Sequence, residues 1–358
     1  MRCCGPYLFP VTPHTQGIGL CGNSCIIVAM PDHDTQDSEA LIIERDVQLA
    51  PFTSFRIGGP ARFFTRVGTL EQLRQALVFA RRAGVPFCIL GGGSNLLVSD
   101  QGFDGVVIRL QLKGIRVSGH LVEVRAGVDL MALVEHTAHW GLSGLERLAG
   151  IPGLVGGAVR GNAGAYGSCI GDVAVKVRAL DALSLEVITL DHDACAFDYR
   201  NSRFKRDPGL VVLSALLELS GGAHLEIERR VEETVKRREA RQLQCDRSAG
   251  SFFMNPVVTD PELIRRFETE QGVRCREGRV PAGWLIDQAQ LRSSRVGAAM
   301  VSPRHANYLV NTGNATAEEM TRLARMVKSG VRGSLGVQLE EEVSCVGFTP
   351  APRGRRPS

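Results

Sequence analysis

The sequence contains no apolar run near the roughly 20 residues that a membrane-spanning helix needs. Strong charge of one sign is also missing. The formal net charge is +4 over 358 residues and both signs are scattered, so the charge pattern does not indicate nucleic-acid binding. A secretory signal needs a basic start and an unbroken apolar stretch, which proline, histidine and glycine interrupt here. We therefore expect a globular protein of the cytoplasm, with no membrane or nucleic-acid partner.

Cysteine pairs at metal-ligand spacing are absent as well. Four of the ten cysteines lie in the N-terminal segment and the other six are dispersed singly. Irregular spacing in a long chain argues against a disulfide framework, and the lack of CxxC pairs argues against a metal site. We expect reduced thiols, as in a reducing cytoplasm, and no bound metal.

The two ends differ from the rest of the chain. Residues 1–45 show no usable apolar period and include the polar, acidic stretch PDHDTQDSEA. We expect a disordered extension there, although translation could instead begin at Met30. A disordered tail is expected over residues 348–358. Between these ends the length leaves room for two domains with separate cores.

Glycine, in contrast, is abundant and concentrated at two places. Residues 145–167, LERLAGIPGLVGGAVRGNAGAYG, contain seven glycines interleaved with apolar residues, and GGGSN occupies residues 91–95. Glycine lets the main chain turn sharply and approach another molecule closely. Bare amides at such loops suit a large, flat, partly phosphorylated ligand. For residues 145–167 alone, a packing corner without a ligand is an equal alternative, and the presence of the other cluster makes that alternative much weaker.

Apolar spacing predicts the elements around GGGSN, which comes first along the chain. A strand over 61–67 is followed by helical spacing over 70–83, and a short strand at 87–90 leads into the glycines. This order resembles a nucleotide-binding unit, but the GxGxxG fingerprint and a long following helix are missing. Residues 50–220 are expected to form one α+β domain, whose other elements are strands within 106–126, 175–190 and 210–219 and a helix at 130–140.

The second half begins with a charged helix at 225–242, whose charges we expect to be solvated. Its spacing favours the ion pairs Glu232–Lys236 and Glu233–Arg237. From residue 248 the pattern is one of mixed strands and helices. These include a helix at 318–327 and a last strand at 336–346.

Three residues are candidates for chemistry: Arg200 in YRNSRFK, Ser251 in AGSFFMNP and Glu342 in LEEEV. Each also has a structural interpretation. Arg200 could anchor a turn, Ser251 could stabilise a turn beside Gly250, and Glu342 could be a solvated strand carboxylate. Taken singly, the structural interpretations are favoured.

The series of motifs changes this interpretation. GGGSN, IPGLVGGA, NAGAYG, YRNSRFK, AGSFFMNP, PAGWLIDQ, HANYLVN and LEEEV occur in this order. The series closely resembles the UDP-N-acetylenolpyruvoylglucosamine reductase family over roughly residues 47–347. The resemblance implies an α+β fold, with a two-part FAD-binding domain of the vanillyl-alcohol-oxidase (PCMH) type at 46–222. A smaller α+β substrate-binding domain follows at 223–347.

The resemblance also implies a function. In that family NADPH reduces a non-covalent FAD, which then reduces a UDP-sugar enolpyruvyl ether to UDP-N-acetylmuramate for peptidoglycan. A cytoplasmic monomer with a role in cell-wall synthesis, cell shape and cell division is implied as well. The short interval from Arg200 to Ser251 fits the family subgroup that lacks an extra tyrosine-bearing loop over the substrate.

Carried over position by position, the resemblance assigns the site residues. Arg200, Ser251 and Glu342 match the catalytic residues. Substrate contacts match Asn255, Arg292 and His305. The residues matched to the cofactor site are Gly91, Gly92, Gly93, Ser94, Asn95, Ile151, Pro152, Gly156, Gly157, Asn162, Gly164, Ala165 and Gly167.

The implied chemistry agrees with these roles. Hydride delivery to the methylene carbon leaves negative charge beside a carboxylate, which a fixed guanidinium such as Arg200 can stabilise. A proton must then reach the neighbouring carbon, and Ser251 is suited to relay it. Glu342 could assist the enolic intermediate, in a protonation state that the sequence leaves open.

Two positions depart from the family pattern. Phe52 stands where a polar residue is usual, and Met254 replaces the commoner lysine of AGSFFMNP.

Two other functions compete with the one that the resemblance implies. A flavin oxidase with a covalent link to His or Cys is one alternative. Neither glycine cluster contains His or Cys, but Cys88 and Cys169 lie just outside them. A catalytically inactive flavin-binding module would be expected to lack one of the three catalytic residues, and all three are present.

Overall fold

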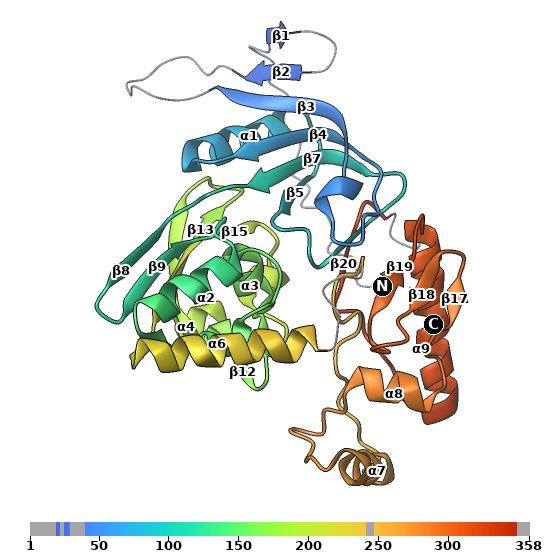
Figure 1. Cartoon of the computed structure of the whole chain (residues 1–358). Coiled ribbons are helices and arrows are strands. Elements are labelled where there is room, and N and C mark those ends of the chain that lie inside the picture. Colours follow the sequence, from blue (N-terminus) through green and yellow to red (C-terminus); the bar gives the residue numbers. More distant parts are fainter. Residues whose placement is uncertain (1–18, 22–24, 29–39, 241–246, 349–358) are drawn as a thin grey trace, which may run out of the picture.

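The computed structural model describes residues 19–21, 25–28, 40–240 and 247–348, and its N-terminal part is built on a six-stranded sheet (Figure 1). Strands β4, β7 and β5 are parallel, and the pairs from β1 to β4 are antiparallel. Helix α1 (Leu70–Arg82) packs on this sheet with the apolar spacing that the sequence predicts. In sheet order the strands are β1 (Gly19–Cys21), β2 (Cys25–Val28), β3 (Leu41–Gln48), β4 (Pro60–Val67), β7 (Phe103–Leu110) and β5 (Phe87–Leu90).

Two of these strands lie in the segment expected to be disordered. β1 pairs with β2, and β2 pairs with β3, so the sheet extends into residues 19–21 and 25–28. Leu41 and Ile43 of β3 are fully buried. Residues 41–45 therefore form part of a packed strand, which corrects the expectation that they are disordered. The remainder of the extension and the expected tail from residue 349 onward lie outside the described residues.

A second, five-stranded antiparallel sheet completes the first half of the chain. Helices α2 (Leu130–His139) and α3 (Val155–Gly161) lie beside it (Figure 1). The two sheets share one apolar core. In sheet order the strands are β14 (Val187–Asp191), β13 (Ala174–Asp181), β15 (Leu210–Glu218), β9 (Leu121–Arg125) and β8 (Ile115–Ser118).

The helix α3 was not predicted from the sequence. Three of its seven residues are glycine, and each glycine costs roughly 1 kcal/mol relative to alanine in a helix interior. Tertiary packing offsets this cost, because Val155 and Val159 are fully buried. Gly156 is needed for close approach, since a Cβ there would lie 2.9 Å from the Cβ of Ala126.

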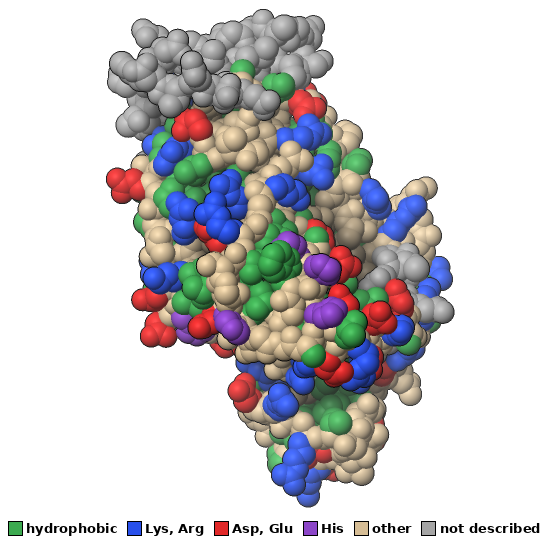
Figure 2. All heavy atoms as spheres, turned by 60° about the vertical axis from the view of Figure 1, so that its left-hand side comes forward, with side chains coloured by type: hydrophobic (Ala, Val, Ile, Leu, Met, Phe, Trp, Pro, Cys, Tyr) green, Lys and Arg blue, Asp and Glu red, His purple; other side chains and the backbone are tan. Residues whose placement is uncertain are grey.

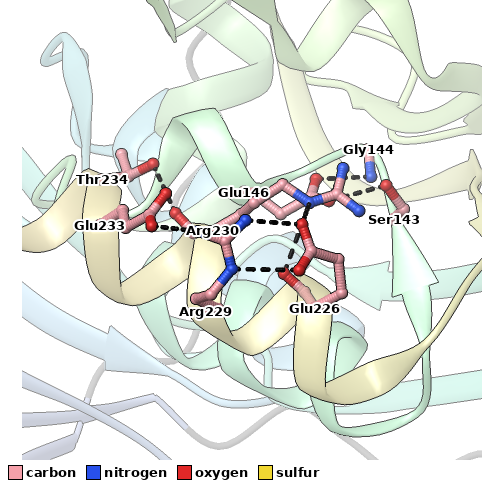
Figure 3. A network of polar contacts seen from close by, with 8 residues as sticks. All are labelled: Ser143, Gly144, Glu146, Glu226, Arg229, Arg230, Glu233 and Thr234. Carbon is pink, nitrogen blue, oxygen red and sulfur yellow. Dashed lines mark hydrogen bonds and ion pairs between the residues drawn. The ribbon is translucent and has the colours of Figure 1, made fainter.

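Helix α6 (His224–Glu239) confirms the predicted charged helix, and it packs on the first half of the chain. Its buried Ile227 and Val231 belong to the first core, although the expected domain boundary assigns this helix to the second domain. A polar network joins α6 to the 3-10 helix η2 (Glu146–Leu148) (Figure 3). In it Arg230 lies 3.6 Å from the carboxylate of Glu146.

The second half of the described chain forms its own apolar core around helix α9 (Ala317–Leu335). That helix runs eight residues beyond the predicted end, because Val327 and Val331 continue its buried face. Gly336 then ends it in a left-handed conformation, at φ +67°. The other elements are α7 (Pro261–Gln271), α8 (Ala282–Gln288), and a sheet of β17 (Arg295–Val296), β18 (Ala299–Val301) and β19 (Leu309–Asn311).

The predicted last strand over 336–346 is wrong in extent, because only β20 (Ser344–Val346) is a strand. β20 pairs in parallel with β6 (Leu96–Val98), directly after the first glycine loop. The C-terminal strand therefore returns to the N-terminal half (Figure 1). Val346 packs in a small core with residues of β4 and β7, which physically joins the two halves.

Short elements connect these parts. None of the helices in the described ranges combines the length and the apolar character that a membrane crossing requires. Charges of both signs are interspersed over the face in Figure 2, as the sequence predicts. The short elements are η1 (Ala50–Phe52), β10 (Leu142–Ser143), β11 (Gly164–Ala165), β12 (Ser168–Cys169), η3 (Ile170–Asp172), α4 (His192–Cys195), α5 (Arg203–Arg206) and β16 (Ser220–Gly221).

Candidate active site

A cavity of about 910 Å³ lies where the two halves of the chain meet. Both glycine clusters line it on one side, and residues of the second half line it on the other. Arg200, Ser251 and Glu342 all line this cavity, although 142 residues separate the first from the last. The fold thus brings the three candidate catalytic residues to the same space as the two glycine clusters.

The two glycine clusters contact each other directly. The hydroxyl of Ser94 donates a hydrogen bond of 2.9 Å to the carbonyl of Pro152. A Cβ on Gly92 would lie only 3.0 Å from the Cα of Gly153, so a larger residue would push the loops apart. Gly93 has φ +65°, and a Cβ there would lie 1.9 Å from the carbonyl oxygen of Phe52. These glycines are therefore required by packing and backbone conformation.

Other glycines leave the cavity wall bare. Gly157 and Gly161 line the cavity, and a Cβ on either would meet no protein atom within 4 Å. Main chain without side chains can approach a flat or phosphorylated group closely. The wall therefore fits FAD, the cofactor that the sequence implies. Most of the matched cofactor residues line it: Gly91, Gly92, Gly93, Ser94, Asn95, Ile151, Pro152, Gly156, Gly157, Gly164 and Ala165.

Arg200 is held in place by main-chain and side-chain contacts. Its φ of +53° is a left-handed conformation that a residue with a side chain adopts only when its surroundings impose it. Its Nη2 donates a hydrogen bond of 2.8 Å to the carbonyl of Gly164, in the second glycine cluster. Lys205 donates a hydrogen bond of 2.9 Å to the carbonyl of Arg200 itself. The guanidinium is thus fixed beside the cavity wall.

Glu342 forms an ion pair with Arg200. The Nε of Arg200 lies 2.8 Å from Oε1 of Glu342. Burial raises the pKa of Glu342 above its ordinary value, and the charges of Arg200 and Lys205 act in the opposite direction without cancelling that effect. The carboxyl therefore holds a proton more readily than a solvated glutamate.

Ser251 lies on an extended segment between two others. It bridges to Tyr308 on one side, and the next residue, Phe252, accepts a hydrogen bond of 2.8 Å from the amide of Glu342. The hydroxyl of Ser251 has no hydrogen-bond partner within the described ranges, and the residue lines the cavity. It is therefore placed to donate to a bound molecule.

Four predicted site residues do not line the cavity. Asn162 is buried, where its side chain accepts from the amide of Gly171 at 3.0 Å. Arg292 pairs with Asp287 and donates to the carbonyl of Pro303.

Gly167 lies in the turn beyond Tyr166, and Asn255 accepts a hydrogen bond of 3.1 Å from the amide of Ala282. His305, the third predicted substrate contact, does line the cavity. The structure thus gives Asn162, Asn255 and Arg292 local structural contacts, and the functional assignments of these residues stay predictions.

The sequence reasoning missed several residues at the cavity. Lys205 lies in the YRNSRFK motif, five residues after Arg200, and its spacing on a short helix could have identified it. Tyr166 also lines the cavity, next to the matched Ala165. Tyr308 lies in the HANYLVN motif, three residues after His305, and Arg238 lies in the charged helix α6, whose charges were expected to be solvated.

The two departures from the family pattern have structural contacts outside the cavity lining. Phe52 stacks on Phe64 with ring centroids 5.0 Å apart, and the guanidinium of Arg109 lies 4.9 Å from its ring. An aromatic residue is therefore accommodated by packing. The amide of Met254 donates a hydrogen bond of 2.9 Å to the carbonyl of Glu340, a contact that does not depend on the side chain.

Comparison with known proteins gives two family matches. A model of an FAD-binding domain matches residues 61–188, and a model of the UDP-N-acetylenolpyruvoylglucosamine reductase C-terminal domain matches residues 241–346. The chain therefore carries an FAD-binding domain followed by this second domain. Together with the two sheets and the separate second core, this confirms the predicted fold class.

Whole-chain relatives extend this result. UDP-N-acetylenolpyruvoylglucosamine reductase of Solibacter usitatus is 37% identical over 308 residues, covering 86% of this chain and 97% of that protein. The enzyme of the same name from Streptomyces coelicolor is 35% identical, covering 84% and 90%. The crystal structure of the Thermus caldophilus reductase superposes with a TM-score of 0.69 at 35% identity, covering 86% and 99%. This chain belongs to the UDP-N-acetylenolpyruvoylglucosamine reductase family.

Proposed function

We propose that this chain reduces the enolpyruvyl ether of UDP-N-acetylglucosamine to UDP-N-acetylmuramate, with NADPH as reductant and non-covalently bound FAD. The observation that carries the proposal is the convergence of Arg200, Ser251 and Glu342 on the cavity whose other wall is the pair of glycine loops. The first glycine loop and the wall around Gly157 would hold the FAD, which supplies hydride chemistry when bound.

Arg200 stabilises negative charge on the substrate. Hydride addition to the methylene carbon leaves charge on the neighbouring carbon, where a carboxylate can delocalise it into an enolate. A guanidinium has five N–H donors, and the contacts with Gly164 and Glu342 leave donors for the enolate oxygens. Because its backbone and side chain are already held, Arg200 needs little reorganisation to do so.

Ser251 and Glu342 serve the proton that completes the reduction. Ser251 lines the cavity, and its hydroxyl has no hydrogen-bond partner among the described residues, so it can donate to the substrate carbon and be replenished from solvent. Glu342 has a raised pKa, and a protonated carboxyl beside Arg200 can share its proton with the enolate oxygen. Lys205 positions Arg200 by donating a hydrogen bond to the main-chain carbonyl of Arg200.

The covalent-flavin alternative depends on a nucleophile at the cavity. Cys88 lines it, so this thiol is the residue to test. Cys169 does not line it, and burial together with the carboxylate of Asp172 raises the pKa of its thiol, which disfavours the thiolate. Acid precipitation should release the flavin from the wild type and from Cys88→Ser equally. Flavin retained on the wild-type pellet and released from the variant would establish a covalent link.

Several finer expectations belong to the same proposal. A cytoplasmic monomer, domains at 46–222 and 223–347, and roles in cell-wall synthesis, cell shape and division all follow from the proposed reaction and its family. The packing of α6 on the first core supports moving the functional boundary to the segment after that helix.

The decisive experiment is anaerobic mixing of the purified flavoprotein with NADPH, followed by the enolpyruvyl sugar nucleotide. Loss of the flavin absorbance in the first step and its recovery in the second, with UDP-N-acetylmuramate identified by mass, would support the proposal. Recovery with oxygen but not with the enolpyruvyl substrate would show an oxidase. If NADPH did not bleach the flavin, the proposed reductant would be ruled out.

A further inference from the structure

The motif LEEEV places three glutamates in a row, and each has different surroundings in the structure. Glu342 lines the cavity and lies 2.8 Å from the Nε of Arg200. Glu340 is exposed, and its carboxylate forms no hydrogen bond or ion pair among the described residues. Glu341 lies outside the cavity lining, yet its side chain is only 11% exposed. The middle carboxylate is thus enclosed by protein without belonging to the cavity.

The partner of Glu341 is Lys328, on helix α9. Its Nζ donates a hydrogen bond of 2.9 Å to Oε1 of Glu341, and the Lys328 side chain is 21% exposed. Taking a charge out of water is costly unless an opposite charge compensates for it, so each of these groups holds the other in place. The pair therefore ties residue 341 to a helix of the second core.

The main chain beside this pair is held from two other sides. The amide of Glu342 donates a hydrogen bond of 2.8 Å to the carbonyl of Phe252, and Phe253 forms an antiparallel bridge with Glu341. In the GGGSN loop, the side-chain amide of Asn95 donates a hydrogen bond of 3.2 Å to the carbonyl of Glu342. These bonds fix the path of the extended segment, and rotation about its own axis is left to the side chains.

The ion pair restrains that rotation. Successive side chains of an extended segment point to opposite sides, so Glu341 meets α9 while Glu342 faces the cavity. A turn of the segment that took Glu342 away from Arg200 would also pull Glu341 away from Lys328. The buried pair resists this movement from the side opposite the cavity.

We propose that the ion pair between Lys328 and Glu341 positions the carboxyl of Glu342 beside Arg200. Lys328 and Glu341 are positioning residues, because both lie outside the cavity lining and act through residue 342. This inference rests on the proposed function, in which Glu342 shares a proton with the enolate.

The position of Glu342 also determines how readily it holds a proton. Arg200, in the loop before α5, and Lys205, in α5, are the charged groups that act on this carboxyl. The other segments beside it, at Phe252 and Asn95, bring no charge. Burial raises the pKa of Glu342 despite the two cations. Rotation toward solvent would bring that pKa back toward its ordinary value.

The test compares two double variants of the flavin-loaded, full-length protein, both with the net charge of wild type. Lys328→Met with Glu341→Gln removes the ion pair and keeps side chains of similar size. Lys328→Glu with Glu341→Lys reverses the pair and so keeps the attachment to α9. Glu340→Gln is the matched control, because it removes the exposed neighbouring carboxylate.

Removal of the pair should slow reoxidation of the reduced flavin by the enolpyruvyl substrate about tenfold, since a small misplacement of a catalytic group costs up to roughly 10²-fold. Reduction of the flavin by NADPH does not use Glu342 and should keep its wild-type rate. The reversed pair and Glu340→Gln should both reoxidise near the wild-type rate. Rapid-mixing absorbance measures both phases. Equal slowing of the two phases, or a reversed pair as slow as the removed one, would overturn the proposal.

Urea unfolding gives a second measurement that needs no turnover. In each background, the unfolding free energy of Glu342→Gln is compared with that of its parent protein from acidic to neutral pH. Because the folded-state pKa of Glu342 is raised, the wild-type parent loses stability relative to Glu342→Gln as pH rises through that pKa. This pH dependence should shrink when the pair is removed and persist when it is reversed. An undiminished pH dependence after removal would also overturn the proposal, since a pair with a purely structural role leaves the titration of Glu342 as it was.

Failure of the proposed function would look different. A wild-type protein whose flavin is not reduced by NADPH, or is not reoxidised by the enolpyruvyl sugar nucleotide, would refute the assigned reaction. The urea series needs neither substrate, so it would still show whether the ion pair sets the position of Glu342.

Discussion

At the scale of single residues, Arg200 carries the clearest sign of a built site. Its left-handed backbone would cost about 1 kcal/mol or more in a residue with a side chain. The hydrogen bond from Arg200 to Gly164 and that from Lys205 to the Arg200 carbonyl offset this cost. The same contacts hold the guanidinium against Glu342, so the strained residue and the residue with a raised pKa are partners.

Replacing Ser251 should separate the two half-reactions. Reduction of the flavin by NADPH needs no proton donor at the enolpyruvyl carbon. The flavin of Ser251→Ala should therefore lose its absorbance with NADPH at a nearly normal rate. Reoxidation by the enolpyruvyl substrate should slow by roughly 10²–10⁴-fold, as for a lost general acid. Rapid-mixing absorbance resolves both phases. Equal slowing of the two phases, or slowing of neither, would mean that Ser251 is not the proton donor and only stabilises a turn.

Glu342 gives a pH-dependent stability with a definite sign. Its folded-state pKa is raised, so its contribution to stability is fully present below the ordinary glutamate pKa and is lost as pH rises through the folded pKa. The unfolding free energy of Glu342→Gln relative to wild type should therefore increase from pH 4 to neutral pH. Urea unfolding of both proteins across this range measures the difference. A difference that shifts the other way would mean that the Arg200 charge, and not burial, dominates.

At the scale of elements, glycines of the two clusters serve different purposes. Gly93 is required by its own loop, because its φ is positive and a side chain would strike the carbonyl of Phe52. Gly157 has an ordinary helical position and open space beside it. Packing demands the first glycine, and only a ligand demands the second.

These two glycines therefore make a matched pair of variants. Gly93→Ala should lower the stability of the protein by several kcal/mol or prevent folding, since main-chain atoms must move. Gly157→Ala should fold normally, with a slightly stabilised helix, yet bind FAD less tightly because its methyl group projects into the cavity. Thermal unfolding of the flavin-free proteins and FAD titration distinguish the two effects. Unchanged FAD affinity in Gly157→Ala would remove this wall from the cofactor site.

A second carboxylate, Glu146, anchors helix α6 and should respond to pH in the direction opposite to Glu342. Burial acts to raise its pKa, but hydrogen bonds from Ser143 and Gly144, both at 2.7 Å, and the charge of Arg230 outweigh burial and lower it. Figure 3 shows these groups around the carboxylate. The ionised form is therefore favoured by folding.

Replacing this carboxylate with an amide should destabilise the protein at neutral pH. Glu146→Gln should lose about 1–3 kcal/mol, because charged hydrogen bonds are replaced by neutral ones. The loss should shrink as pH falls from the ordinary glutamate pKa through the lower folded pKa, where wild type is protonated too. Urea unfolding at neutral and acidic pH is the measurement. A cost that is independent of pH would mean that shape, not charge, holds α6.

At the scale of the whole molecule, the cavity exists because the chain crosses between its two halves several times. Phe55, Ile57 and Leu97 pack in the second core, and β20 returns to pair with β6. Asn311 donates a hydrogen bond of 2.9 Å to the carbonyl of Phe55. These crossings fix how the glycine loops face Ser251, so the site depends on contacts far from it.

Asp100 is one such distant contact. Its carboxylate accepts hydrogen bonds from the amides of Ala317 and Glu318, at 2.8 Å and 3.1 Å, and so caps helix α9 from the other half of the chain. Asp100→Ala should cost about 0.5–2 kcal/mol, as for a lost helix cap, and should lower FAD affinity by loosening the cavity. Asp104→Ala, in an exposed ion pair with Arg62, is the control and should cost almost nothing. Equal stability of the two variants would count against a joining role for Asp100.

The elements that could be predicted from the sequence are those whose pattern is local. The strand–helix–strand order from 61 to 90, the helix α6 and the ordered series of motifs all follow from periodicity or from residue types at short spacing. That series was sufficient to predict the family, the FAD-binding domain and the three candidate catalytic residues. Two of those residues, Arg200 and Glu342, prove to be in contact.

The remaining features could not be predicted from the sequence, because long-range packing overrides local preference. Three glycines in seven residues do not predict a helix, yet α3 forms since its apolar side is buried. Spacing predicted that Glu233 would pair with Arg237, but competing Arg229 takes that carboxylate. Arg229 and Arg237 both lie four residues from Glu233, so spacing alone does not choose between them, and the choice is made by how the side chains lie in the folded chain.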